Sequence, residues 1–135
     1  MGWAIFLIAS FVYLSTIEKT ASLWDCGEFI AAAYKLEVVH EPGAPFFLMM
    51  GRIFSLFASD VNEVAMMVNS MSAIASAFTI LFLFWTITAF GRKIYLKEKS
   101  INKAKIFAVL GAGLVGALAY TFSDSFWFSA VEGEV

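Results

Sequence analysis

The chain has few of the residues from which enzymes usually build metal or redox sites. Its 135 residues include one cysteine (Cys26), one histidine (His40) and two prolines. A single cysteine excludes an internal disulfide and a cysteine-based metal site. Glycine-rich phosphate loops, zinc-ligand patterns and nucleophile elbows are also absent. We therefore predict no metal and no other cofactor, and no motif supports a divalent cation.

Charged residues are also scarce, and two long runs contain none. Only 15% of the residues are charged and 61% are apolar, whereas soluble domains are nearer 45–50% apolar. The 27 residues Val64–Phe90 and the 17 residues Ile106–Phe122 carry no charged side chain. About 20 apolar residues cross a hydrocarbon core of about 30 Å. The composition predicts an all-α integral membrane protein in contact with the lipid bilayer.

A third apolar run, Trp3–Ile17, has 15 residues. A secretory signal peptide would carry a basic segment before this run, but the first basic residue is Lys19. We interpret the run as a first transmembrane helix whose upstream flank is missing. The predicted spans are then 3–17, 64–90 and 106–122, and we expect more helices to follow residue 135.

The basic residues predict the orientation of these spans. Six of the nine lie in the short segment 91–105, which the positive-inside rule places in the cytoplasm. Residues 18–63 then form an outer loop, and a second outer loop begins near residue 123. Ten of the eleven acidic residues fall outside. This orientation predicts that an impermeant maleimide labels Cys26 from outside, provided that the thiol is accessible. The basic segment has no aromatic interleaving beyond Tyr95, so we predict no nucleic-acid partner.

The first outer loop contains two short helical patterns. Residues 25–38 have apolar residues at helical spacing, and Ser22, Asp25 and Glu28 have the spacing of capping boxes. Pro42-Gly43 suits the central positions of a type II turn. Pro45 suits the start of a second helix, 46–58, which is too short to span a bilayer. We expect both helices to lie at the membrane surface.

Small and polar residues within the spans predict packing between helices. Ala112/Gly116 and Gly113/Ala117 have the spacing that lets helices approach closely. Asn69 lies in the second span and is expected to find a hydrogen-bond partner in protein rather than in lipid.

The acidic pair Asp25 and Glu28 is the first candidate for chemistry. Carboxylates three residues apart share a helix face, here at the mouth of the first span. Either carboxylate could act as a general base toward a hydroxyl arriving from outside. The structural alternative is that Asp25 caps the helix and Glu28 completes the box. Spacing alone leaves both interpretations open.

Four other polar residues are candidates for binding. His40 follows the first outer helix, either as a surface residue or as part of a site. Arg52 either extends toward lipid headgroups or holds a phosphate. Glu132 and Glu134 lie in the second outer loop and could converge with Asp25. The aromatic residues at 126–128 are interpreted as an interfacial belt.

The first outer loop resembles a specific family. The matching residues are 24–36, 40–45 and 51–54, and the likeness extends to 68–70 and 129–135. They resemble a bacterial family of long multi-pass membrane proteins, related to the animal transmembrane protein 260, a protein O-mannosyltransferase. The family has proline after the histidine, whereas this chain has Glu41.

The resemblance implies a GT-C glycosyltransferase fold, of which residues 1–135 would be the N-terminal fragment. In that fold two membrane-parallel helices of the first outer loop cover the active site, and an acidic residue after the first span serves catalysis. By position this residue is Asp25, with Glu28 second. Donors are sugars on polyprenyl phosphate, so Arg52 would bind the phosphate and His40, Glu132 and Glu134 would line the site.

The expected function is therefore transfer of a sugar, mannose by analogy, from a lipid-linked donor to a hydroxyl of a protein or glycan. It would take place at the outer face of a bacterial cytoplasmic membrane, and the fragment alone would be inactive. A transporter segment would predict ionisable residues within the spans, and the runs 64–90 and 106–122 have none. A non-catalytic scaffold remains as an alternative.

Overall fold

The computed structural model describes residues 1–22, 24–41, 43–95 and 102–133. Within these ranges the chain is helical and has no β-strand, as the all-α prediction requires. The helices are α1 (Gly2–Ser15), α2 (Cys26–Lys35), α3 (Pro45–Ser55), the 3₁₀ helix η1 (Val61–Glu63), α4 (Val64–Tyr95), α5 (Lys103–Thr121) and α6 (Asp124–Val131).

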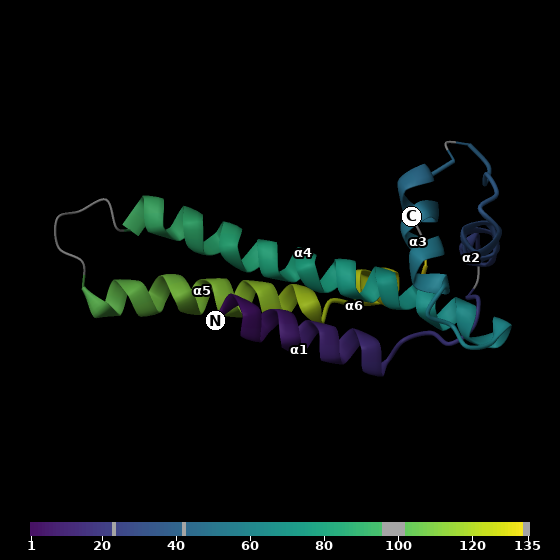
Figure 1. The fold of residues 1–135 in the computed structure, drawn as a ribbon. Coiled ribbons are helices and arrows are strands. Elements are labelled where there is room, and N and C mark those ends of the chain that lie inside the picture. The colour runs from purple at the N-terminus through teal and green to yellow at the C-terminus, as the bar shows by residue number, and fades with distance from the viewer. Residues whose placement is uncertain (23, 42, 96–101, 134–135) are drawn as a thin grey trace.

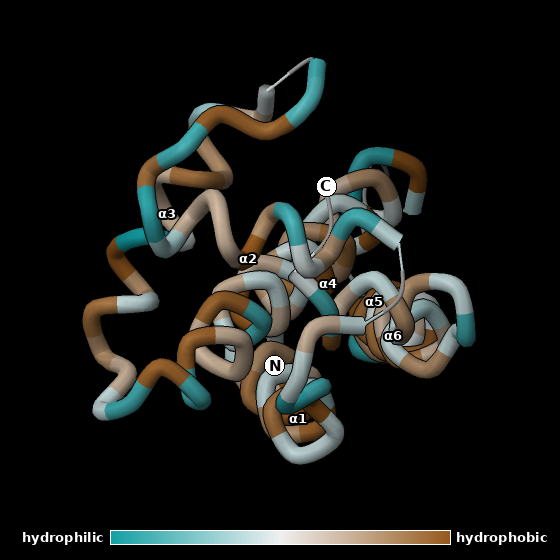
Figure 2. Tube along the Cα trace, turned by 90° about the vertical axis from the view of Figure 1, so that its right-hand side faces the viewer, coloured by the Kyte–Doolittle hydropathy of each residue, from teal (hydrophilic) through white to brown (hydrophobic). Residues whose placement is uncertain are grey.

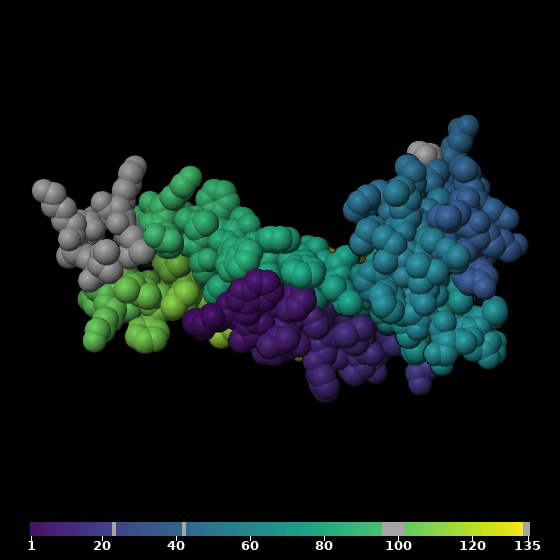
Figure 3. All heavy atoms as spheres, in the orientation of Figure 1, coloured from purple at the N-terminus to yellow at the C-terminus, as the bar shows by residue number. Residues whose placement is uncertain are grey.

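Three helices form an elongated bundle, and two others pack at one of its ends. Helices α1 and α5 lie along α4, while α6 lies against the N-terminal part of α4 (Figure 1). Helices α2 and α3 contact each other and the start of α4. They project to one side of the bundle, which gives the molecule a bent outline (Figure 3). Helices α2 and α3 therefore form a separate layer at the end of the bundle.

Among the residues that the structure describes, two helices rather than three are long and apolar enough to cross a membrane. These are α4, which contains the predicted span 64–90, and α5, which contains the predicted span 106–122 except for Phe122 at its C-cap. The short third span predicted at 3–17 corresponds to α1, which has only 14 residues and does not reach this length. Its end is marked by the hydroxyls of Ser15 and Thr16, which both donate to the carbonyl of Val12. Figure 2 shows that the bundle helices are mainly apolar and that many hydrophilic residues lie in the connections.

Close packing between α4 and α5 depends on small residues, as predicted. A Cβ atom on Gly113 would lie 2.7 Å from Thr88 Cγ2 and 3.0 Å from the Phe84 ring. A Cβ atom on Gly116 would lie 2.7 Å from Ile87 Cδ1. Real Cβ atoms do not approach so closely, so Gly113, which faces the Phe84 ring, needs to be glycine at this helix separation. At Gly116 the contact is with the end of the Ile87 side chain, which can move aside.

Both helices predicted for the first outer loop are present, as α2 and α3, and both are shorter than predicted. Helix α2 ends at Lys35 because Leu36 adopts a left-handed conformation, with φ of 57°. The following turn closes one residue earlier than predicted, through a hydrogen bond of 2.9 Å from the Gly43 N–H to the His40 carbonyl. Gly43 has φ of +91°, which glycine adopts without steric cost. Pro42 lies outside the described residues.

Helix α6 was not predicted. Residues 124–131 were interpreted as loop with an aromatic belt, but they form a helix preceded by Ser123. The Trp127 N–H donates to the Ser123 carbonyl at 2.9 Å, which closes the first turn. Ser123 followed by Asp124 is a usual helix-start signal. Eight residues are too few to show a clear helical period.

Candidate functional site

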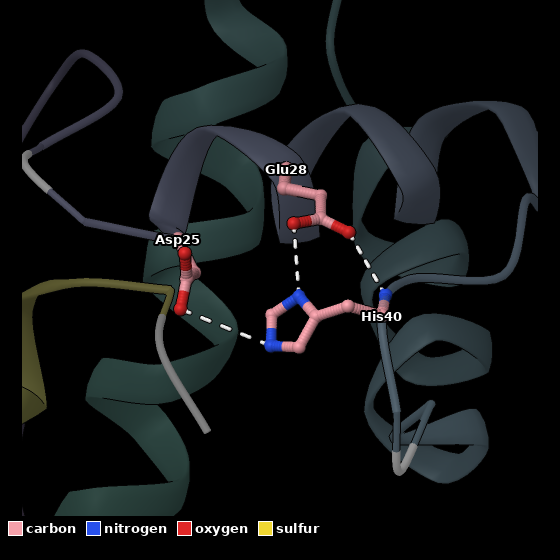
Figure 4. Close-up of polar contacts among 3 residues, drawn as sticks. All are labelled: Asp25, Glu28 and His40. Carbon is pink, nitrogen blue, oxygen red and sulfur yellow. Dashed lines mark hydrogen bonds and ion pairs between the residues drawn. The ribbon is translucent and has the colours of Figure 1, made fainter.

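Asp25, Glu28 and His40 meet at the N-terminal end of α2 (Figure 4). Glu28 Oε1 accepts a hydrogen bond of 2.9 Å from the backbone N–H of His40. Glu28 Oε2 lies 2.9 Å from His40 Nδ1, and His40 Nε2 lies 3.9 Å from Asp25 Oδ2. The side chains are between 45% and 58% exposed, so a ligand from solvent can reach all three. We refer to these three residues as the acidic–histidine cluster.

The predicted capping boxes are not formed. Asp25 occupies the position before α2, but its carboxylate makes no capping hydrogen bond. The first turn is closed by the backbone instead, because the Phe29 N–H donates to the Asp25 carbonyl at 3.0 Å. Glu28 turns toward His40 rather than back toward the cap. The structural alternative proposed for this acidic pair is therefore wrong, and the Asp25 carboxylate faces His40 and solvent.

The electrostatics of the cluster favour the charged forms of His40 and Glu28. The hydrogen bond to Glu28 raises the pKa of His40, and the negative charges of Glu28 and Asp25 add to this effect. The two hydrogen bonds from His40 lower the pKa of Glu28, with the backbone bond first. An ionised carboxylate only accepts hydrogen bonds, so Nδ1 of His40 is the donor toward Glu28. Nε2 is thereby left to face Asp25.

This arrangement suits proton transfer at Asp25. The Asp25 carboxylate is exposed and faces Nε2 of His40, and a carboxylate in such a position can accept a proton from a hydroxyl within reach. The three residues also offer one ligand atom each, all within 4.8 Å of one another, and mixed histidine and carboxylate ligands are common for divalent cations. The absence of a metal stays a prediction.

Arg52 does not lie in this cluster. Its Nη1 donates to the Tyr34 carbonyl and lies 3.5 Å from Ser55 Oγ, while its guanidinium lies 5.4 Å from the centre of the Tyr34 ring. Tyr34 is nine residues after Asp25, which along a helix is roughly 13 Å. The contacts that the structure shows for Arg52 therefore tie α3 to the C-terminal end of α2.

The acidic end of the chain approaches the segment before α2 rather than the cluster itself. Glu132 follows α6 and lines a cavity together with Glu18 and Trp24. Glu132 was expected to converge with Asp25. It instead shares a cavity with Trp24, the residue directly before Asp25 in the chain. Glu134 lies outside the described residues. Glu18 was missed as a site candidate, although it is the first acidic residue after the first apolar run.

The burial of Asn69 and Cys26 decides two further predictions. Asn69 is fully buried, and its Nδ2 donates to the carbonyls of Glu18 at 2.8 Å and Thr20 at 3.3 Å. The expected partner in protein is confirmed. Cys26 is fully buried as well, so its thiol is not accessible for the proposed labelling from outside.

With this geometry established, the chain can be compared with known proteins. Residues 25–135 match the family model described as the Protein O-mannosyl-transferase TMEM260 N-terminal domain. The chain belongs to this family. This match confirms the resemblance to transmembrane protein 260 that the sequence showed. It begins at Asp25 and therefore includes the acidic–histidine cluster.

Relatives with curated names lead to the same family. A protein of Dictyostelium discoideum named Protein O-mannosyl-transferase tmem260 is 27% identical over 97% of this chain. A mouse protein named Protein O-mannosyl-transferase TMEM260 is 26% identical over 98% of it. The chain spans only 14% and 16% of the lengths of these relatives. No solved structure matches the chain.

Proposed function

We propose that the chain is the N-terminal part of a membrane glycosyltransferase of the GT-C type, which transfers mannose from a polyprenyl-phosphate donor to a hydroxyl of a protein or glycan. The observation that carries the proposal is the exposed acidic–histidine cluster at the start of the TMEM260 family match. The relatives' names supply the reaction class. The donor, the acceptor and the bacterial cytoplasmic membrane come from the resemblance.

In this proposal the reaction is a single displacement at the anomeric carbon. The acceptor oxygen attacks that carbon, a new carbon–oxygen bond forms, and the bond from the carbon to the phosphate oxygen breaks. The polyprenyl phosphate leaves with the bonding electrons, and the acceptor proton passes to an oxygen of Asp25. The configuration at the anomeric carbon is inverted because the nucleophile and the leaving group are on opposite faces.

Glu28 and His40 act as positioning residues. The two hydrogen bonds from His40 hold the Glu28 carboxylate, and His40 in turn faces Asp25 with its other ring nitrogen. Nε2 of His40 lies 3.9 Å from Asp25 Oδ2, so the histidine fixes where the proposed proton acceptor lies relative to α2.

In the membrane, α4 and α5 would be spans, and α1 would be a short third span beside them. The basic residues near their connection would lie in the cytoplasm, and the layer formed by α2 and α3 would lie at the outer face. The position of Arg52 at the C-terminal end of α2, where it binds the Tyr34 carbonyl, counts against its predicted role at the donor phosphate, because that phosphate leaves the carbon attacked beside Asp25. Glu132 and Glu134 would contribute to donor binding.

The test compares the full-length parent with its Asp25→Asn variant in isolated membranes. Transfer of radiolabelled mannose from polyprenyl-phosphate mannose is expected to fall by about 10²–10⁴-fold, the usual contribution of a positioned base. Asp60→Asn is the matched control, because Asp60 caps the 3₁₀ helix η1 and asparagine caps equally well. Equal transfer by parent and Asp25→Asn at equal expression would remove Asp25 as the base. Absence of transfer by the parent would favour a different donor or the scaffold alternative.

A further inference from the structure

A cavity of about 600 Å³ lies beside the segment that precedes the acidic–histidine cluster in the chain. Its walls include Glu18, Thr20, Ser22, Trp24, Phe128 and Glu132. A second cavity of about 330 Å³ shares Glu18, Phe128 and Glu132 with it, so the two adjoin along these residues. Binding sites for small ligands typically have volumes of about 300–1,000 Å³. We call the two together the Trp24 cavity.

The walls of the Trp24 cavity are fixed by bonds between segments that are distant in the sequence. The Glu18 N–H donates to the Val131 carbonyl at the end of α6, at 3.2 Å. Asn69 on α4, fully buried, donates to the Glu18 carbonyl at 2.8 Å and to the Thr20 carbonyl. Glu132 continues directly from α6. The segment 18–22 is therefore anchored to two helices, and the cavity is part of the tertiary structure.

The chemistry of the cavity combines acidic, hydroxyl and aromatic side chains. Glu18 Oε1 accepts hydrogen bonds from the Thr20 N–H at 3.0 Å and the Thr20 hydroxyl at 2.7 Å, and these bonds lower the pKa of Glu18. Glu132 supplies a second carboxylate, and Asp124 lines the smaller part of the cavity with a third. Carboxylates repel phosphate and other anions. They accept charge-assisted hydrogen bonds from neutral hydroxyl groups.

Trp24 adds an apolar face that no core residue covers. Its side chain is 88% exposed, and its backbone has φ of +64°, which is rare for a bulky residue. An exposed aromatic ring held in an uncommon backbone conformation is typical of a binding position rather than of packing. Pyranose rings present a face of C–H groups that stacks on such a ring, while their hydroxyls point outward to polar partners.

We propose that the Trp24 cavity binds the neutral hexose ring that the enzyme transfers, with the ring stacked on Trp24 and its hydroxyls donating to Glu18 and Glu132. This inference rests on the proposed function and assigns the sugar, rather than the phosphate, to these carboxylates. Trp24 is adjacent in the chain to Asp25, so a sugar held here lies next to the proposed base. Glu132 is then a residue for the sugar of the donor and not for its phosphate.

The test is direct binding of methyl α-mannopyranoside to the purified full-length parent, observed as saturation transfer to the sugar protons by NMR. Binding is expected for the parent, and Trp24→Ala and Glu132→Gln are each expected to weaken it about tenfold, the effect of losing one charge-assisted hydrogen bond or its equivalent. Trp24→Phe should retain most of the binding because it keeps an aromatic face. In the transfer assay Trp24→Ala should raise KM more than it lowers kcat.

Two substitutions serve as controls for unspecific effects. Trp3→Ala removes an exposed tryptophan on α1, and Glu37→Gln removes an exposed carboxylate after α2; both should leave sugar binding unchanged. Circular dichroism and thermal midpoints check that each variant is folded. Loss of binding on addition of EDTA, with no effect of Trp24→Ala, would indicate a cation between the carboxylates and overturn the proposal.

The remaining outcomes separate this inference from the proposed function. Absence of mannoside binding by the parent, or equal binding by parent, Trp24→Ala and Glu132→Gln, would overturn the sugar site even if transfer is observed. Binding that depends on Trp24 and Glu132, in a parent that transfers no mannose from polyprenyl-phosphate mannose, would support the sugar site and refute the proposed reaction.

Discussion

Glu28 binds His40 through both carboxylate oxygens, one on the backbone N–H and one on the imidazole Nδ1, each at 2.9 Å. The two residues are twelve apart in the sequence, so this pair ties the first turn of α2 to the segment that follows the helix. Phe29 packs edge-on against the His40 ring at 5.9 Å. The orientation of His40 toward Asp25 is therefore set by α2 itself.

The first prediction concerns the titration of His40. Because the hydrogen bond to Glu28 is the main cause of its raised pKa, Glu28→Gln should lower the midpoint more than Asp25→Asn does. The ring protons of His40 can be followed by NMR in the full-length parent and assigned by their absence from the His40→Gln variant. Glu41→Gln is the control and should leave the midpoint close to that of the parent. A larger effect of Asp25→Asn would contradict the geometry.

The same pair predicts a pH window for local stability. His40 has a raised pKa in the fold, so its contribution to stability is complete below its ordinary pKa of 6.5 and is lost as pH rises through the pKa in the fold. Glu28 has a lowered pKa in the fold, so its contribution to stability is complete above its ordinary pKa of 4.5 and is lost as pH falls through the pKa in the fold. Amide exchange near His40 should be slowest between these two values. Exchange that is unchanged across the window in parent and Glu28→Gln alike would count against the pair.

A second prediction concerns Tyr13, which is fully buried and donates to the Thr121 carbonyl at the end of α5 at 3.0 Å. Tyr13→Phe leaves this carbonyl without its donor and should lower the free energy of unfolding by about 1–3 kcal/mol. The neighbouring Tyr120→Phe is the control, because Tyr120 is 44% exposed and should change stability by less than about 0.5 kcal/mol. Unfolding in mixed detergent micelles measures both. Equal effects would show that the buried bond contributes nothing specific.

A third prediction compares two glycines on α5. Gly113→Ala places a methyl group against Thr88 and Phe84, and such overpacking costs about 1–3 kcal/mol. Gly111→Ala meets no atom within 4 Å and should be neutral or stabilising by up to about 1 kcal/mol, since alanine favours helix. Thermal unfolding of the two variants in the same detergent gives the comparison. Destabilisation by both would mean that α4 and α5 are packed differently.

A fourth prediction concerns Arg52, whose bond to the Tyr34 carbonyl links α3 to the end of α2. Arg52→Gln should speed amide exchange at Leu36 and Glu37, which donate to the Ala32 carbonyl in the last turn of α2. Hydrogen bonds to charged groups contribute about 1.5–3 kcal/mol, so the increase should be about tenfold or more. Lys35→Gln, which removes a cation from the same turn but not this bond, is the control. Unchanged exchange with a raised KM for the lipid-linked donor would favour a role in phosphate binding alone.

Several elements were predictable because their causes are local in the chain. Composition and helical period alone predicted the charge-free runs that form α4 and α5 and the glycine spacing on α5. Pro45 and the apolar pattern after it predicted α3 within a few residues. The end of α1 at Ser15 was not predictable from hydrophobicity, because the apolar run continues to Ile17 while serine and threonine hydroxyls bond the last turn.

The candidate site was only partly predictable. Spacing identified Asp25 and Glu28 but suggested a capping box, because a capping box and a bond to His40 use the same residue types. Choosing between these two interpretations requires knowing where the chain runs at His40, twelve residues after Glu28. Glu18 belongs to no motif, and Trp24 is only the first residue of the family likeness. Their cavity exists because α6, a short helix without a clear period, brings Glu132 and Phe128 against the segment after α1.

The sequence by itself determined the helical class, the two long apolar helices, the small-residue contact between them and the membership of the TMEM260 family, because these depend on composition, periodicity and motif. Tertiary structure alone decided that Glu28 binds His40, that Arg52 anchors α2, that Cys26 is buried and that Glu18 and Glu132 share a cavity. Each of these is a contact between segments far apart in the chain, and its geometry depends on how α2, α3 and α6 pack on the start of α4.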